Sequence, residues 1–358
     1  MFSLENLAHL IHQALGKLLN PTITLLVEML IVGICAISLF AVLGLVLVFM
    51  ERKVSAYMQI RLGPNRVGPK GLAQTAADTL KLLIKEGLVP DGADKFLFNL
   101  APFIVMIASM LLLAPIAFAK NFAMWDMNIG ILYISAVSSV SVIGILMAGW
   151  ASNNKYSLIG AMRSGAQIVS YELSAGLSIL SMVVLTGSLK ISDIIASQQT
   201  GWWIWKGHIP AIISFVIFII AVTAETNRAP FDLAEAESEL TAGFHTEYSG
   251  MRFALFFLAE YVNIFIVCSI ASVLFLGGWM PFHLGNWGAF NQIMDYIPSS
   301  IWFISKTFFL IFVLMWFRWT FPRLRIDQLL NLEWKYLLPI GMFNLLLMTI
   351  VAIKGWHF

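Results

Sequence analysis

Charged residues are scarce in this sequence: Asp, Glu, Lys and Arg make up only 12% of its 358 residues, whereas hydrophobic residues make up 59%. Water-soluble domains carry roughly a quarter charged residues, so this shortage excludes an ordinary soluble domain and favours lipid as the surrounding solvent. The formal net charge of +2 says little, because in a membrane protein the placement of charge matters more than its sum.

Residues that bind redox cofactors are also lacking. The two cysteines, Cys35 and Cys268, lie far apart in apolar stretches and offer neither metal-ligand spacing nor a disulfide framework. There is no GxGxxG fingerprint, Walker loop or cysteine cluster. All six histidines lie outside or at the edges of the apolar stretches, so they cannot ligate a haem inside a bilayer. We expect this chain to hold no metal, NADH site or tightly bound redox cofactor of its own.

What the sequence does contain is a series of apolar runs, each long enough to cross a bilayer as a helix of about 18 residues or more. We therefore predict an all-α polytopic membrane protein with a single membrane domain, residues 1–358. Eight spans are expected, at about residues 25–50, 98–119, 129–151, 157–187, 209–225, 252–277, 299–321 and 336–354.

Lys and Arg are distributed unevenly between the two sides that these spans define. Fifteen lie in the segments that share one side, and five lie on the other. Since basic residues accumulate on the cytoplasmic side, the first group of segments should be cytoplasmic and both termini should lie outside. The cytoplasmic segments are 51–97, 152–156, 226–252 and 318–335.

The first long cytoplasmic segment, 51–97, begins with a turn-rich stretch that carries Arg61 and Arg66 among glycines and prolines. After Gly71 the apolar residues recur at helical spacing, with Asp78 on the polar side, which predicts an amphipathic helix over 71–86 at the membrane surface. The basic residues could merely enforce topology and bind lipid headgroups. An ordered loop next to an interfacial helix favours a binding role.

The second long segment, 223–252, is acidic. A helix after Pro230 would place Asp232, Glu235 and Glu239 on one face and Glu237 elsewhere. Because like charges on one face repel, we expect cationic partners, with Arg228 and the arginines of the first loop as the candidates. The alternative interpretation is an ordinary solvated acidic face.

Two acids lie within predicted spans, Glu172 in the fourth and Glu260 in the sixth, and Glu225 lies at the cytoplasmic edge of the fifth. A carboxylate inside a bilayer is costly, so such residues usually face a protein interior and serve transport. Residues at 3- and 4-residue spacing form a polar stripe on the fourth span, with Glu172 at one edge, although small polar residues also serve helix packing. The stripe comprises Gln167, Ser170, Tyr171, Ser174, Ser178 and Ser181.

Three other charged residues of the spans favour simpler interpretations. Glu28 and Lys306 lie near the outer ends of their spans, where their side chains can extend to the interface. Arg163 lies near the inner end of the fourth span, where a structural ion pair and a function are equally good interpretations.

Several segments together resemble the H subunit of bacterial NADH-quinone oxidoreductase (respiratory complex I), the family that includes mitochondrial NADH dehydrogenase subunit 1. The similarity covers about residues 25–350 and rests on ERKVSAYMQIRLGPNRVGPKGLAQTAADTLKLLIKE, RSGAQIVSYEL, AETNRAPFDLAEAESELTAGFHTEYSGMRFALFFLAEY and RWTFPRLRIDQL, which occur in this order.

The resemblance implies a role for each group of residues. Arg61, Arg66 and Asp78 would line or brace a quinone chamber beside the acidic loop of Asp232, Glu235, Glu237 and Glu239. The buried acids Glu225, Glu172 and Glu260 would couple quinone reduction to proton translocation. The substrate would be ubiquinone or menaquinone. Expected partners are the hydrophilic subunits that carry the terminal iron–sulfur cluster and the antiporter-like membrane subunits, in a bacterial inner membrane.

Two rival interpretations stay open. A related hydrogenase or formate-lyase complex uses a membrane anchor of the same fold, although the full arginine–glycine–proline loop favours the quinone version. A self-sufficient ion-coupled transporter would also use buried acids. It would predict broken helices and an internal repeat, and neither is clear in this sequence.

Overall fold

The computed structural model describes residues 12, 13, 16, 20–120, 122–234, 237–283 and 287–356. Within them lie eight helices long and apolar enough to cross a membrane, which confirms the predicted all-α polytopic architecture. They are α2 (Pro21–Met58), α4 (Lys95–Leu112), α5 (Gly130–Ala151), α6 (Lys155–Thr186), α9 (His208–Glu225), α11 (Gly250–Phe275), α13 (Ser299–Thr320) and the continuous segment Ile326–Lys354.

Shorter elements connect these spans. The 3-10 turn η1 (Pro69–Gly71) leads into α3 (Gln74–Ile84), so the predicted amphipathic helix forms over most of its expected length. Its leucines Leu80 and Leu83 are exposed on the surface of this chain, as expected for a helix that rests on lipid or on a partner. The remaining short elements are β1 (Ala117–Ala119), its antiparallel partner β2 (Phe122–Ala123), α7 (Ile191–Ala196), α8 (Trp203–Lys206), α10 (Glu237–Leu240), η2 (Gly243–His245) and α12 (Gly288–Asp295).

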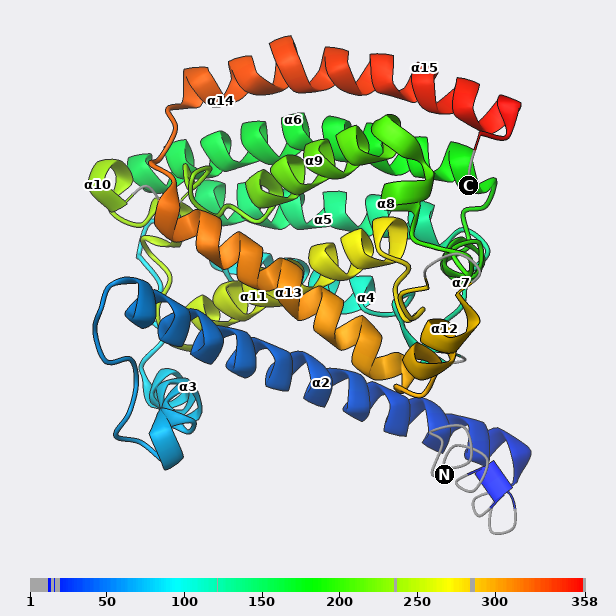
Figure 1. Ribbon diagram of the computed structural model, residues 1–358. Helices are drawn as coiled ribbons and strands as arrows, with labels where there is room; N and C mark the ends of the chain where they lie inside the picture. Colours follow the sequence, from blue (N-terminus) through cyan, green and yellow to red (C-terminus); the bar gives the residue numbers. More distant parts are fainter. Residues whose placement is uncertain are drawn as a thin grey trace.

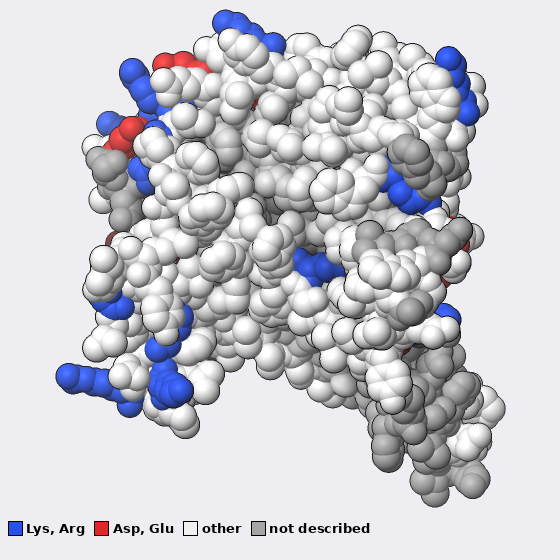
Figure 2. Space-filling model, viewed as in Figure 1, with Lys and Arg blue, Asp and Glu red and all other residues white. Residues whose placement is uncertain are grey.

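The segments 59–94 and 226–249 lie at one end of the bundle, called here the long-loop side. Figure 1 shows the start of α2 and the end of α15 near the other end, called here the opposite side, as an even number of spans requires. Most of the Lys and Arg visible in Figure 2 gather at the long-loop side. This distribution agrees with the charge bias that predicted a cytoplasmic location for that side.

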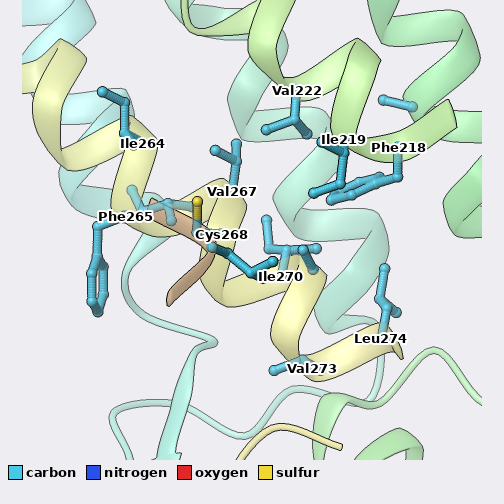
Figure 3. Close-up of a cluster of buried hydrophobic side chains, with 14 of the residues drawn as sticks. Phe218, Ile219, Val222, Ile264, Phe265, Val267, Cys268, Ile270, Val273 and Leu274 are labelled. Atoms are coloured by element: carbon cyan, nitrogen blue, oxygen red, sulfur yellow. The ribbon is translucent and has the colours of Figure 1, made fainter. Parts of the chain in front are cut away.

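Helix α11 is the most enclosed span. Nearly all its residues from Leu255 to Phe275 are buried, because α2, α4, α9 and α13 all pack against it. Its sequence is apolar around the whole circumference, which is typical of a helix without a lipid face. Figure 3 shows Phe265, Cys268 and Val273 of α11 in the apolar cluster that α9 joins through Phe218 and Val222.

Two spans are longer than predicted. Helix α2 continues through Glu51 to Met58, so its 38 residues reach about 57 Å, far more than the roughly 30 Å hydrocarbon core. Figure 1 shows α2 crossing obliquely, with its first turns beyond the other helices. The last span begins at α14 (Ile326–Leu332) and passes through a π-helical turn, η3 (Glu333–Leu337), into α15 (Leu338–Lys354). In both cases the additional turns carry a buried acid that has a partner inside the protein, Glu51 in α2 and Glu333 in η3.

Helix α4 is shorter than predicted, since it ends at Leu112 rather than near residue 119. Turns follow the helix and lead into the β1–β2 hairpin, whose strands pair Ala117 with Ala123. The apolar run continues past the helix because Ile116 and Ala117 are buried against the bundle, so hydrophobicity alone could not mark the helix end.

Candidate functional site

An ion-pair centre of two acids and two arginines lies where α2, α11 and α13 meet at the long-loop side. Arg228, just past the end of α9, places its Nη1 at 3.1 Å from both carboxylate oxygens of Glu51 and its Nε at 3.0 Å from Glu260 Oε1. Arg318 of α13 also pairs with Glu51. The Arg228 guanidinium further stacks on the ring of Tyr261, at 4.4 Å from its centroid.

The charge on Arg228 is fixed by these neighbours. Burial would lower the pKa of its guanidinium, but the carboxylates of Glu260 and Glu51 outweigh burial and hold that pKa well above its ordinary value. Each acid of the pair offsets the desolvation cost of the arginine, so removing one partner would leave an uncompensated buried charge.

Three separate cavities border this centre and the buried acids. The first opens on the long-loop side, has a water-accessible volume of about 380 Å³, and is lined by Glu51, Arg228, His245 and Glu260. The second, of about 40 Å³, lies between Glu260 and Glu225. The third, of about 60 Å³, extends from Glu225 to Glu172. Since a water molecule needs roughly 10–15 Å³ of such volume, even the smaller cavities have room for a few water molecules.

Successive cavities share an acid. Glu260 lines the first and the second, Glu225 lines the second and the third, and Asn263 lies one turn beyond Glu260 beside both smaller cavities. The structure therefore brings together the three acids that the sequence singled out, in the spatial order Glu260, Glu225, Glu172.

Glu172 is hydrogen-bonded to hydroxyl groups of α5 rather than to the polar stripe of its own helix. Ser139 Oγ donates to Glu172 Oε1 at 2.5 Å, and Ser138 Oγ lies at 3.5 Å from the same atom. The α6 stripe points to other helices. Gln167 donates to the carbonyls of Ala224 and Phe231 at 2.7 and 2.8 Å. All six residues of the predicted stripe are buried, while Glu172, at the edge of the stripe, takes its hydroxyl partners from α5.

The acidic loop is only partly as predicted. Residues 226–234 form turns rather than a helix, and α10 begins only at Glu237. Asp232 and Glu239 therefore do not share a helical face. Glu235 and the side chain of Glu237 lie outside the described residues.

The cationic partners of this loop also differ from the prediction. Asp232 pairs with Arg323 and Glu239 with Arg163, each at 2.8 Å, while Arg228 turns inward to Glu51 and Glu260. The hydrogen bond from Arg163 lowers the pKa of the exposed Glu239 carboxyl. Arg163 thus has the structural ion pair that was one of its two interpretations.

The first loop stays away from the acids. Arg61 is exposed and donates to Gln59 at 2.6 Å, and Arg66 is exposed as well. Neither arginine contacts the acidic loop within the described ranges, which corrects the expectation that they serve as its partners. Asp78 pairs with Arg52 of α2. Partial burial raises the pKa of Asp78, but the hydrogen bonds from Arg52 and Gln74 and the charges of Arg52 and Lys81 together outweigh burial and lower it overall.

An apolar cavity of about 300 Å³ lies between α2, α3 and α11, and the Arg52–Asp78 pair is part of its wall. Leu45, Val48 and Leu258 supply apolar wall, and Gly44 lies so close to Leu258 that a Cβ at this position would force the leucine side chain to move. Arg52, Phe253 and Phe257 line this cavity and also the first cavity beside the ion-pair centre. The two spaces are therefore neighbours across a shared wall.

Four functional candidates were missed by sequence reasoning or misplaced by it. Glu51 was assigned to a loop, and Glu333 to the loop before the last span, yet both are buried. His245 is buried between the first two cavities, and burial lowers the pKa of its imidazole to about 3. Lys306 does not extend to the interface. Its Nζ is buried and donates to three carbonyls, of Leu276, Gly278 and Met280, at 2.6 to 3.0 Å.

This fold and site define a class: a multi-pass membrane protein that holds paired and unpaired carboxyl groups along a row of internal cavities. Comparison with known proteins then identifies the family. The sequence profile of the NADH dehydrogenase family matches residues 29–349, and the chain belongs to this family.

Curated relatives agree over the full length. The chain is 56% identical to the H subunit of NADH-quinone oxidoreductase from Bacteroides fragilis and 57% identical to that from Bacteroides thetaiotaomicron, in both cases over 100% of each chain. It is 49% identical to the corresponding H subunit from Brevibacillus brevis over 322 residues, which are 89% of this chain and 92% of the relative.

Proposed function

We propose that this chain is the membrane subunit of an NADH-quinone oxidoreductase that forms part of the quinone chamber and couples quinone reduction to proton translocation. Family membership and full-length identity to proteins named as the H subunit support the assignment to the oxidoreductase. The arrangement of acids and cavities supports the coupling role.

The quinone is proposed to enter through the apolar cavity between α2, α3 and α11. An apolar lining suits an isoprenoid tail, and the Arg52–Asp78 pair supplies polar groups where a headgroup would pass toward the ion-pair centre. Arg61 and Arg66, exposed on the loop that leads into α3, are free to contact hydrophilic subunits. Those subunits would carry the terminal iron–sulfur cluster that supplies the electrons.

Reduction of the quinone changes charge and proton demand beside the first cavity. There Arg228 balances Glu51 against Glu260, so a change in charge near Glu51 alters the hold of Arg228 on Glu260. A proton can then pass through water in the two smaller cavities from Glu260 to Glu225 and on to Glu172. From Glu172 the signal would reach the antiporter-like subunits in a bacterial inner membrane, with both termini outside.

The observation that carries this proposal is the sharing of one acid between each pair of successive cavities. Glu172→Gln and Glu225→Gln in the intact complex keep size and polarity but cannot carry a proton. Each is expected to abolish proton translocation, measured as acidification of the lumen of inside-out membrane vesicles, with NADH-dependent quinone reduction slowed as well.

Glu28→Gln serves as the matched control, since Glu28 pairs with His12 at the far end of α2. Full translocation in both Glu172→Gln and Glu225→Gln would contradict the proposal. Mild-detergent purification of the tagged chain separates the rivals. If hydrogenase subunits co-purify with the chain, its role is that of a membrane anchor rather than a quinone-site subunit. If the chain purifies alone and catalyses ion exchange, it is a transporter.

A further inference from the structure

A further buried carboxyl group, that of Glu333, lies on the other side of α6 from Glu172. Glu333 has 0% of its surface exposed and occupies the π-helical turn between α14 and α15. Its Oε1 accepts a hydrogen bond from Ser174 of α6. None of the three cavities described above includes it. A π-helical turn inside a longer helix is rare and frequently marks a functional position.

Within the described part of the chain, Glu333 has no cationic partner. Its second oxygen, Oε2, is buried without a hydrogen-bond partner, and the ionisable group packed nearby is Tyr171, whose hydroxyl donates to the Leu329 carbonyl at 3.0 Å. A carboxylate buried without a cation is strongly unfavourable, so this carboxyl group is accommodated with its proton on.

Hydroxyl and amide groups continue from Glu333 along the seam between α6, α9 and α15. Ser178 follows Ser174 by one turn, and its buried Oγ also lacks a partner. One turn further, Ser181 Oγ lies 2.6 Å from Ser214 Oγ, which accepts a hydrogen bond from Asn344 Nδ2 at 2.7 Å. Figure 1 shows α15 lying along α6 for the length of this seam.

The row of polar groups leads toward the opposite side. Ser181 lies five residues before the last residue of α6, Thr186, so it lies within about 8 Å of that helix end. Asn344 also donates to the carbonyl of Pro210, in the first turn of α9. The Oδ1 of Asn344 is buried and without a partner, like the unpaired atoms of Ser178 and Glu333. Each of these unpaired oxygen atoms can accept a hydrogen bond from a water molecule or take up a migrating proton.

The helices that hold Glu333 are tied to the acidic loop. Leu324 N donates to the Pro230 carbonyl at 3.0 Å, Arg323 pairs with Asp232 at 2.8 Å, and the Tyr171 ring lies 5.4 Å from that of Phe231. Movement of this loop would therefore be passed to the segment that leads into the turn carrying Glu333.

We propose that Glu333 is a second proton-exchanging group, and that its proton passes along the α6–α15 seam through Ser174, Ser178 and the Ser181–Ser214–Asn344 cluster to the opposite side. The exchange involves a proton alone: it leaves Glu333, moves between hydroxyl groups and water, and is replaced when the loop returns to its first position. This route is separate from the row of cavities between Glu260 and Glu172.

Infrared difference spectroscopy of the intact complex, quinone-reduced minus oxidised, tests the proposal directly. The wild type is expected to show a protonated-carboxyl C=O band that shifts in D₂O and that is missing in Glu333→Gln but retained in Glu28→Gln. The protons released per electron should fall in Glu333→Gln while quinone reduction continues at close to the wild-type rate. Glu172→Gln, recorded in parallel, reports on the first route, so the two routes succeed or fail independently.

A difference spectrum of Glu333→Gln identical to that of the wild type would overturn the proposal. So would a Glu333 band that does not exchange in D₂O together with an unchanged number of protons per electron, since the acid would then be only a hydrogen-bonding partner of α6. If Glu333→Gln fails to assemble, Ser178→Ala replaces it. Its hydroxyl makes no hydrogen bond that the fold depends on, and its removal is expected to slow deuterium exchange of the Glu333 band. Unchanged exchange would overturn the route.

Discussion

The two ends of the cavity row hold their acids in different ways. At the long-loop side, Glu51 and Glu260 are both paired with Arg228, and Glu51 also with Arg318. Deeper in the bundle, Glu172 and Glu225 have no cation within ion-pair distance among the described residues. Glu172 instead has the hydroxyl groups of Ser138 and Ser139, and both deeper acids border small cavities.

Carboxyl groups with and without a cationic partner are suited to two different tasks. A carboxylate that shares an arginine keeps its charge and answers a change in the neighbouring field by shifting its position or partner. A carboxyl group with hydroxyls and water but no cation can change its protonation state with a smaller structural adjustment. Under the proposed function, the paired end would sense charge and the unpaired end would exchange protons.

Removing Arg228 tests the paired end and should have the largest effect. Arg228→Met removes one guanidinium from both Glu51 and Glu260, at a cost to folding of about 3–5 kcal/mol. We expect loss of the assembled complex from the membrane, measured by blue-native electrophoresis. Arg228→Lys retains the charge and should assemble, although one ammonium cannot reproduce both contacts. Normal assembly of Arg228→Met would show that the ion-pair centre is not structural.

Protonation of His245 would place a positive charge between the first two cavities, and the pH dependence of stability reports its cost. Its pKa of about 3 in the folded chain is below the ordinary value of 6.5, so the unfolded chain binds more protons between these values. Stability is therefore fully present above pH 6.5 and falls as the pH drops toward 3. Between pH 7 and pH 5 the loss is about 2 kcal/mol. Thermal unfolding of the detergent-solubilised complex measures it.

His245→Gln is the matched variant, because glutamine is polar but does not titrate in this range. Its unfolding temperature should change less than that of the wild type between pH 7 and pH 5. The same pH dependence in both proteins would assign the loss to other groups and leave the imidazole without a role in acid sensitivity.

The smallest effect is expected at the Arg163–Glu239 pair, which lies on the surface of the long-loop side. Exposed ion pairs are screened by salt and contribute little to stability. Glu239→Gln should leave the unfolding temperature unchanged while changing the salt dependence of quinone reduction. A large loss of stability would show that this pair is buried against a partner subunit in the complex.

Sequence reasoning located the spans well because hydropathy and length are local properties. Helices α5, α6, α9, α11 and α13 begin and end within about two residues of their expected positions. The acids Glu172, Glu225 and Glu260 could also be found, because a carboxyl group within an apolar run is conspicuous.

The remaining site residues could not be found this way, because their roles depend on contacts between distant segments. Glu51 follows an apolar run and reads as the first residue of a loop, but Arg228 and Arg318, 177 and 267 residues away, keep it inside a helix. From its position in the sequence, Lys306 could reach the interface, but in the structure the carbonyls of residues 276–280 surround its ammonium group. The ordinary polar sequence around Glu333 gave no sign of Ser174 as its partner.

Helix α11 is restrained near its middle and at its last residues. At the long-loop side Glu260 is held by Arg228, and at the opposite side the ammonium group of Lys306 binds the carbonyl of Leu276, directly after the helix, and two carbonyls beyond it. Four spans pack around α11. The helix is held in place, because sliding along its length would break the Arg228–Glu260 ion pair or the hydrogen bonds of the Lys306 ammonium group. Under the proposed function, a signal that crosses this protein would travel as redistributed protons and turning side chains, while the central helix stays in register.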